Sequence, residues 1–119
     1  SVARVCRAPA SVASGRVNQH VAIIRPTEGL LPEFLEEFLL LPNTKRRLLT
    51  IAEAGATRQA ITKTQIEDLE VPIPPKSMQA KFVNEKNRAL GLIDKANLQL
   101  EKYEALFASL QNRAFRGEL

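Results

Sequence analysis

The feature that most constrains this chain is where its prolines stop. Three of them crowd into LEVPIPPKSMQ, residues 69–79, and none follows Pro75. Proline cannot continue a strand ladder or a helix interior, and it holds the preceding residue in an extended conformation. The pattern therefore predicts a strand over 69–73 that ends sharply, followed by a long helix whose N-cap is Ser77.

The predicted long helix carries one continuous apolar seam. From Ser77 to about Ala114 only Gly91 weakens it, at a cost of about 1 kcal/mol relative to alanine. The apolar residues step by alternating threes and fours, which is the heptad pattern of a coiled coil about 55 Å long. The 76 residues before it are too few to cover that length, so we expect a second helix to pair with it. The predicted helix-pairing residues are Phe82, Ala89, Ile93, Ala96, Leu100, Tyr103, Phe107 and Leu110.

The first 76 residues combine helix and strand patterns. LLPEFLEEFLLLP (30–42) and NTKRRLLTIAEAG (43–55) are typical of helices, the second with Asn43 as its N-cap. A brief helical turn is expected after Thr62 or Thr64, and strands over 1–7 and 19–26, where β-branched residues gather. The expected fold class is α/β (α+β), mostly helical, with a domain over 1–76 and the coiled-coil helix over 77–119.

Charge points to candidate DNA contacts. The composition is globular, 45% hydrophobic and 25% charged, and the net charge of +4 favours a polyanionic partner. A basic block, an acidic block and a second basic block follow one another along the first 63 residues. Arginine, lysine, asparagine and glutamine contact phosphates and base edges. The candidate DNA-binding residues are Lys45, Arg46, Arg47, Arg58, Gln59, Lys63, Asn18 and Gln19. Ordinary solvated loops and helix faces are the alternative for each of them.

Catalytic patterns are missing from the sequence. The glycines are scattered, and His20 and Cys6 are the only residues of their types, so a catalytic triad or a zinc site lacks members. We expect no enzyme activity of the chain alone, no cofactor and no metal. A single cysteine favours a reducing compartment, and no apolar run reaches the ~18 residues of a membrane span, so a cytoplasmic location is expected.

Four segments in a fixed order resemble a known family. They are NQHVAIIRP (18–26), GATRQAITKTQIEDLEVPIPP (55–75), Gln79 at the start of the long helix, and LQNRAFRGEL (110–119). Together they resemble the DNA specificity subunit of bacterial type I restriction–modification systems. The most specific parts are the Gly-x-Thr to Pro-x-Pro-Pro block and the closing Ala-Phe-Arg-Gly-Glu-Leu.

The resemblance implies a non-catalytic role. Family members have two α/β target recognition domains, each reading half of a split site in double-stranded DNA. Each domain is followed by a long helix, and the two helices pack antiparallel as a spacer that docks the methyltransferase subunits. Methyl transfer, ATP hydrolysis and cleavage belong to the methyltransferase and restriction subunits, so no cofactor is bound by the specificity subunit.

By this resemblance, residues 1–76 are the C-terminal part of a recognition domain and residues 77–119 are the spacer helix. The chain is then expected to be a trimmed piece of something longer, whose upstream DNA-reading half is missing. Two copies pairing antiparallel through the long helix would form a homodimer. Two alternatives stay open: an interaction scaffold with a coiled-coil arm and no DNA binding, and a fragment that competes for the methyltransferase subunit.

Overall fold

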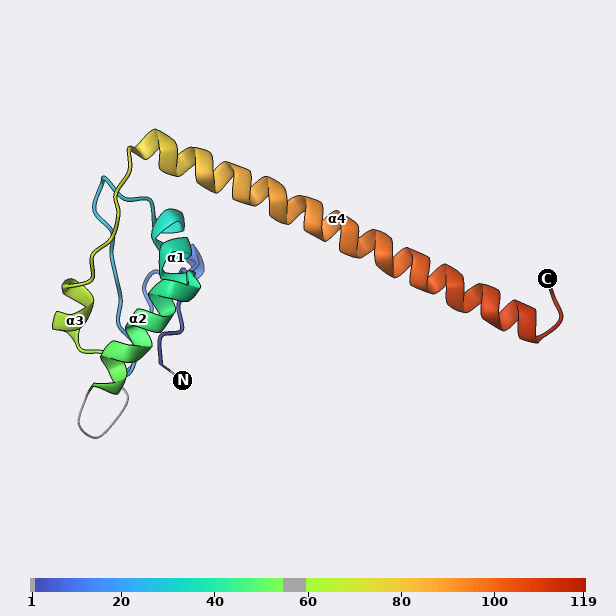
Figure 1. Cartoon of the computed structure of the whole chain (residues 1–119), viewed down its shortest axis with the longest axis horizontal. Coiled ribbons are helices and arrows are strands. Elements are labelled where there is room, and N and C mark those ends of the chain that lie inside the picture. The colour runs from blue at the N-terminus through green and yellow to red at the C-terminus, as the bar shows by residue number, and fades with distance from the viewer. Residues whose placement is uncertain (1, 55–59) are drawn as a thin grey trace. The chain divides into compact units, whose positions relative to one another are not determined.

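The computed structural model describes residues 2–54 and 60–119. Its helical elements in chain order are the 3₁₀ turn η1 (Ala10–Val12), α1 (Pro32–Leu40), α2 (Pro42–Glu53), α3 (Lys63–Glu67) and α4 (Lys76–Phe115) (Figure 1). The chain divides into two compact units, an N-terminal unit up to Val83 and a C-terminal unit, Asn84–Leu119. The predicted boundary after residue 76 stays a prediction, although about two turns of α4 pack with the N-terminal unit.

The expected α/β (α+β) fold class is wrong. Within residues 2–54 and 60–119 every regular element is helical and no strand forms. The segments 19–26 and 69–73 have the β-branched composition of strands, but a strand also needs a neighbour for its ladder hydrogen bonds. No described segment supplies one, so Val21, Ile23 and Ile24 stay about half exposed.

Helices α1 and α2 follow each other without a loop. Leu41 is at once the C-cap of α1 and the N-cap of α2, and Pro42 occupies the first position of α2. A first-turn proline is tolerated because the N–H it lacks would have no helical partner there. The predicted helices are confirmed, but Asn43 is not the N-cap. Its side-chain Oδ1 instead accepts a hydrogen bond from Arg46 Nη2 at 2.8 Å.

A small leucine core holds the N-terminal unit together. Leu35 and Leu39 of α1 are buried four residues apart on one face, and they pack with Leu30 and with Leu48 of α2. Partly buried side chains from outside these helices complete the cluster: Ala3, Val5, Ile61, Leu69 and Val71. Two of the segments expected to be strands, 1–7 and 69–73, thus contribute side chains to the core without joining a sheet.

The short helix α3 is positioned by a capping box. Thr62 Oγ1 accepts a hydrogen bond from Gln65 N at 3.2 Å, and Gln65 Oε1 accepts one from Thr62 N at 2.9 Å. This confirms the expected helical turn and selects Thr62 over Thr64 as its cap.

Helix α4 confirms the long helix and shifts its start by one residue. It begins at Lys76, so Ser77 lies inside the first turn and is not the N-cap. The carbonyl of Pro75 accepts hydrogen bonds from Met78 N at 2.9 Å and Gln79 N at 3.1 Å. The three prolines therefore do precede a fixed helix start, but the first turn is completed by backbone groups and by Gln79 rather than by a serine cap.

Candidate functional site

Gln79 anchors the beginning of α4 in the N-terminal unit. Its side chain is fully buried, and both the oxygen and the nitrogen of its amide form hydrogen bonds. Oε1 accepts from Leu31 N at 2.8 Å, while Nε2 donates to the carbonyls of Gly29 and Pro74 at 2.9 Å and 2.8 Å. One amide therefore ties the first turn of α4 to the chain entering α1 and to the proline segment. Buried polar groups without such partners are costly, which explains why glutamine suits this position.

A ring contact supports the same junction. Phe82, one turn after Gln79, packs edge-on against Phe34 of α1, with ring centroids 5.8 Å apart and planes at 85°. Such T-shaped pairs stabilise by about 0.5–1.5 kcal/mol beyond the area they bury. Phe82 is the first predicted helix-pairing residue, and the structure gives it an intrachain partner while leaving 44% of it exposed.

The closing sequence of the chain ends α4. Gly117 has φ +72°, a left-handed conformation that favours glycine, and Glu118 N donates to the carbonyl of Arg113 at 2.9 Å. This geometry is typical of a Schellman C-cap, in which glycine stops a helix. Two parts of the sequence resemblance, Gln79 and Ala-Phe-Arg-Gly-Glu-Leu (114–119), thus bound one helix of 40 residues, about 60 Å long.

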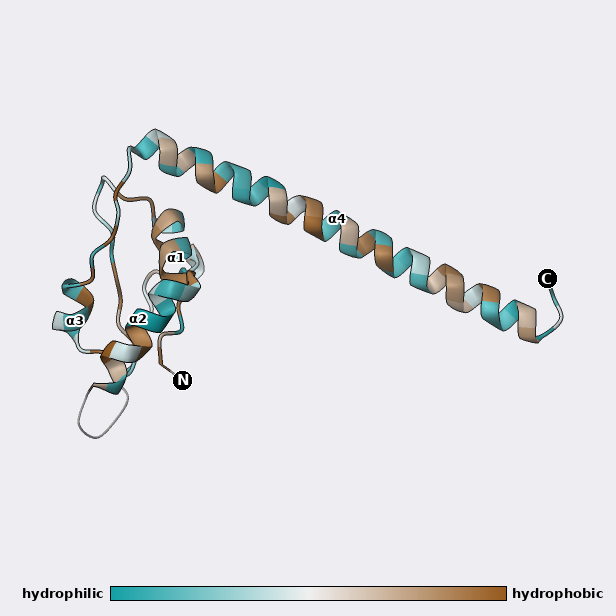
Figure 2. Ribbon diagram, viewed as in Figure 1, coloured by the Kyte–Doolittle hydropathy of each residue, from teal (hydrophilic) through white to brown (hydrophobic). Residues whose placement is uncertain are grey.

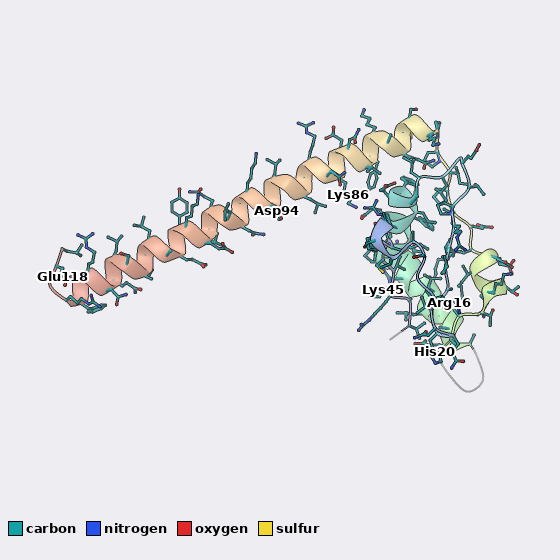
Figure 3. The ribbon with its side chains drawn as sticks, turned by 180° about the vertical axis from the view of Figure 1, so that it is seen from behind. Arg16, His20, Lys45, Lys86, Asp94 and Glu118 are labelled. Carbon is teal, nitrogen blue, oxygen red and sulfur yellow. The ribbon has the colours of Figure 1, made fainter. Side chains whose placement is uncertain are left out.

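The predicted helix-pairing face is solvent-exposed in the C-terminal unit. Every residue from Asn87 to Leu119 is exposed, and apolar residues recur along the whole length of α4 (Figure 2). Figure 3 shows the side chains of α4, Asp94 among them, pointing outward from the helix axis. The large exposed residues of the predicted seam here are Ile93, Leu100, Tyr103, Phe107 and Leu110, with the smaller Ala89 and Ala96 between them. Their assignment to pairing stays a prediction.

The basic triplet Lys45, Arg46 and Arg47 lies in the first half of α2, and all three side chains are exposed. Arg46 is engaged locally by Asn43. Arg47 lines a depression of about 290 Å³ between α2 and α3, which Gln65 and Asp68 also line. Of the three basic residues, only Lys45 lies at the end of the first turn of α2, where a positive charge opposes the helix dipole. Phosphate contact stays a prediction for them.

The remaining DNA-contact candidates are spread over separate elements. Lys63 opens α3 and forms an exposed ion pair with Glu67 at 3.5 Å. Asn18 accepts a hydrogen bond from His20 N at 2.9 Å in an exposed turn, and Gln19 lies beside the His20 ring. Arg58 and Gln59 lie outside the described residues. In the part of the chain that the structure describes, these candidates lie on separate elements and not in one site.

Sequence patterns missed two features of the N-terminal unit. The first is the burial of Gln79, which the sequence singles out only as part of the family resemblance. Its position after three prolines and before an apolar stripe could have suggested a buried amide. Arg7 belongs to the first basic block of the sequence, which gives no sign of an acidic partner. The structure pairs its Nη1 with Glu33 Oε1 at 2.7 Å, and its backbone N–H donates to Glu36 Oε1 at 3.0 Å. Basic and acidic blocks therefore partly neutralise each other inside this unit.

The described residues contain neither a candidate metal site nor a candidate membrane-spanning helix. Among residues 2–54 and 60–119, no group of three or more histidine, cysteine or acidic side chains is placed to hold a metal ion. In the same part of the chain, no helix is long and apolar enough to cross a bilayer. What the structure does offer is an anchored helix with a bare apolar surface.

Comparison with known proteins supports the resemblance predicted from the sequence. The chain is 27% identical over 99 residues to the type I restriction enzyme EcoKI specificity subunit of Escherichia coli strain K12. The alignment covers 80% of this chain. The chain is thus similar to a type I specificity subunit over most of its length. It covers 21% of the length of that relative. No family model matches the chain, and no solved structure matches it.

This relationship confirms the resemblance predicted from the four segments, and it gives the anchored helix a context. The relative is, as its name states, the specificity subunit of a type I restriction enzyme. A helix that is fixed at one end and apolar along its exposed length is suited to assembly rather than to chemistry.

Proposed function

We propose that this chain is a piece of a type I specificity subunit that acts as a non-catalytic scaffold. In this proposal, α4 pairs antiparallel with a second long helix and docks the methyltransferase subunits. The N-terminal unit contacts the phosphate backbone of double-stranded DNA. In the same proposal, methylation, cleavage and ATP hydrolysis belong to methyltransferase and restriction subunits, and the assembly works in the bacterial cytoplasm.

The observation that carries the proposal is the bare seam of α4. Leaving large apolar residues in water costs about 25 cal/mol per Å² of surface that a partner helix would bury. An isolated monomeric helix rarely keeps an exposed apolar patch of this extent. The heptad spacing of Ile93, Leu100 and Phe107 matches knobs-into-holes packing with another helix. A second copy of the chain is the simplest partner, giving a closed twofold dimer.

Sedimentation equilibrium of two matched variants tests the pairing. Leu98 and Leu100 are both 55% exposed, but only Leu100 lies on the seam, about half a turn from Leu98. We expect Leu100→Glu to weaken self-association at least tenfold and Leu98→Glu to change it little. Equal effects of the two variants, or a monomeric wild-type chain at micromolar concentration, would contradict pairing between copies.

DNA contact is tested by its salt dependence. Phosphate contacts release counterions, so affinity for duplex DNA should fall steeply as salt rises. We expect Arg46→Ala and Arg47→Ala to weaken binding uniformly across sequences and to reduce the salt slope by about one each. Arg16→Ala, which removes another exposed arginine of the N-terminal unit, is the matched control.

The alternative function is a protein interaction scaffold without DNA binding. The separation of the candidate contacts over α2, α3 and the turn at Asn18 favours it, because no compact basic site appears in the described residues. Absence of DNA binding at low salt, together with retained binding to a methyltransferase subunit, would establish this alternative.

A further inference from the structure

A second surface of α4 lies beside the seam and differs from it in charge. Arg88, Lys95 and Lys102 follow one another at intervals of seven residues, so they share one line along the helix. Each step of seven is two turns, about 10.5 Å. Leu92, Leu106 and Arg113 form a parallel line, also at multiples of seven. We name these six residues the basic leucine face.

The basic leucine face is exposed and mostly unpaired. Leu92 is 66% exposed and Leu106 is 55% exposed. Arg88 forms an exposed ion pair with Glu85 at 3.4 Å, a kind that contributes little to stability. Within residues 2–54 and 60–119, no ion pair engages Lys95, Lys102 or Arg113. Several cationic groups and two leucines therefore share one open side of the helix.

Helix geometry separates this face from the seam. At 3.6 residues per turn, Leu92 lies about 100° and Lys95 about 160° around the helix from Ile93, so the centre of the face is more than a third of a turn from the line of Ile93, Leu100 and Phe107. A helix seated on the seam therefore leaves Lys95 and Lys102 accessible. A two-stranded pair needs only the seam, so leucines outside it call for a further partner.

A second copy of the chain is a poor occupant. Any copy presents the same basic groups on this face, and like charges brought together are destabilising. The acidic residues of α4 are fewer than its basic ones, four against seven, and one of the four, Glu85, already pairs with Arg88. Duplex DNA would satisfy the cations, yet a phosphate backbone has no apolar surface to cover Leu92 and Leu106.

We propose that the basic leucine face binds an acidic amphipathic helix of a partner protein. That helix carries leucines at heptad spacing flanked by glutamate or aspartate. The leucines meet Leu92 and Leu106, and the carboxylates meet Arg88, Lys95, Lys102 and Arg113. Charge complementarity sets the choice of partner, and the apolar contacts supply most of the affinity. The inference rests on the proposed role of α4 in assembly and names the chemistry of the docked partner.

Binding of synthetic peptides to the full 119-residue chain tests the inference. The probe is a fluorescent peptide of about four heptads with leucine at the seam positions and glutamate beside them. Its control has lysine in place of every glutamate, and a DNA duplex of about 20 base pairs is the third probe. Fluorescence anisotropy should show that the acidic peptide binds most tightly.

Two matched pairs of substitutions locate the binding. Lys95→Gln with Lys102→Gln lowers the net charge by two, as does Asn87→Glu with Asn112→Glu on another side of α4. We expect the lysine variant to weaken peptide binding about three- to tenfold, and the asparagine variant to change it less than twofold. Leu92→Ala with Leu106→Ala should weaken it about tenfold.

Several results would overturn the inference. Equal binding of the basic peptide, tighter binding of the duplex, or equal losses in the two charge-matched variants would each do so. Self-association is measured on the same samples by sedimentation. If the wild-type chain stays monomeric but the acidic peptide still binds through Lys95 and Lys102, pairing between copies fails while this inference stands.

Discussion

The two units of this chain are stabilised in opposite ways. The N-terminal unit buries Leu35, Leu39 and Leu48 around a short helical pair and fixes its edges with specific hydrogen bonds. In the C-terminal unit, every residue from Asn87 onward is exposed, and the backbone hydrogen bonds of the helix are its main support. Apolar residues are abundant in both units, so composition does not distinguish them.

This difference predicts whether a substitution of an apolar residue alters the stability of the chain or its binding to a partner. A substitution in the N-terminal unit changes that unit's own free energy of unfolding. The same substitution in the C-terminal unit has no internal contact to remove, so its effect should appear only when a partner is bound. Identical changes made in both units test this contrast directly.

The largest contrast is expected between two leucines. Leu39→Ala removes a buried side chain, 6% exposed, and should lower the free energy of unfolding of the N-terminal unit by about 3 kcal/mol. Leu106→Ala, at 55% exposure, should change the stability of the chain by less than about 0.5 kcal/mol. Hydrogen exchange in α1 and α2 measures this, because α4 dominates far-ultraviolet circular dichroism. Similar losses in both variants would show that α4 has an intrachain packing partner.

A contrast of about 2 kcal/mol is expected between two glutamines. Gln79→Ala leaves Leu31 N–H and the carbonyls of Gly29 and Pro74 without their partner, and buried groups left unpaired are costly. Gln99→Ala alters an exposed residue of α4 and should change little. The measurement is hydrogen exchange at Leu31 and in the first turn of α4. Unchanged protection in Gln79→Ala would mean that prolines alone fix the helix start.

Sequence patterns predicted the helices well and the sheet wrongly, for one physical reason. Helices such as α1, α2 and α4 are stabilised by hydrogen bonds within the segment, so the spacing of their apolar residues predicts them without knowledge of a neighbour. A strand over 19–26 depends on a neighbour that the pattern of Val21 and Ile23 does not contain. The anchor at Gln79 was missed similarly, because its partners lie about 50 residues away in the sequence.

The capping box of α3 should contribute about 1 kcal/mol. Thr62→Ala removes the acceptor for Gln65 N, and loss of such a cap usually costs about that much. Thr64→Ala, two residues on, keeps the cap and serves as the control. Exchange of the amides of Gln65 and Ile66 reports the difference. If Thr64→Ala is equally disruptive, the backbone bond from Ile66 N to Thr62 O is the main support of this turn.

The smallest contrast is between two arginines that form ion pairs in different units. Arg7 Nη1 lies 2.7 Å from Glu33 Oε1, with both side chains more than a third exposed. Arg88 lies 3.4 Å from Glu85 and is more exposed. We expect Arg7→Ala to destabilise the N-terminal unit by about 0.5 kcal/mol and Arg88→Ala to have no measurable effect on it. The Arg7 effect should shrink as salt rises, because exposed charges are screened. If it persists unchanged in about 1 M salt, packing of the arginine stem on α1, rather than its charge, joins the N-terminal segment to the helical pair.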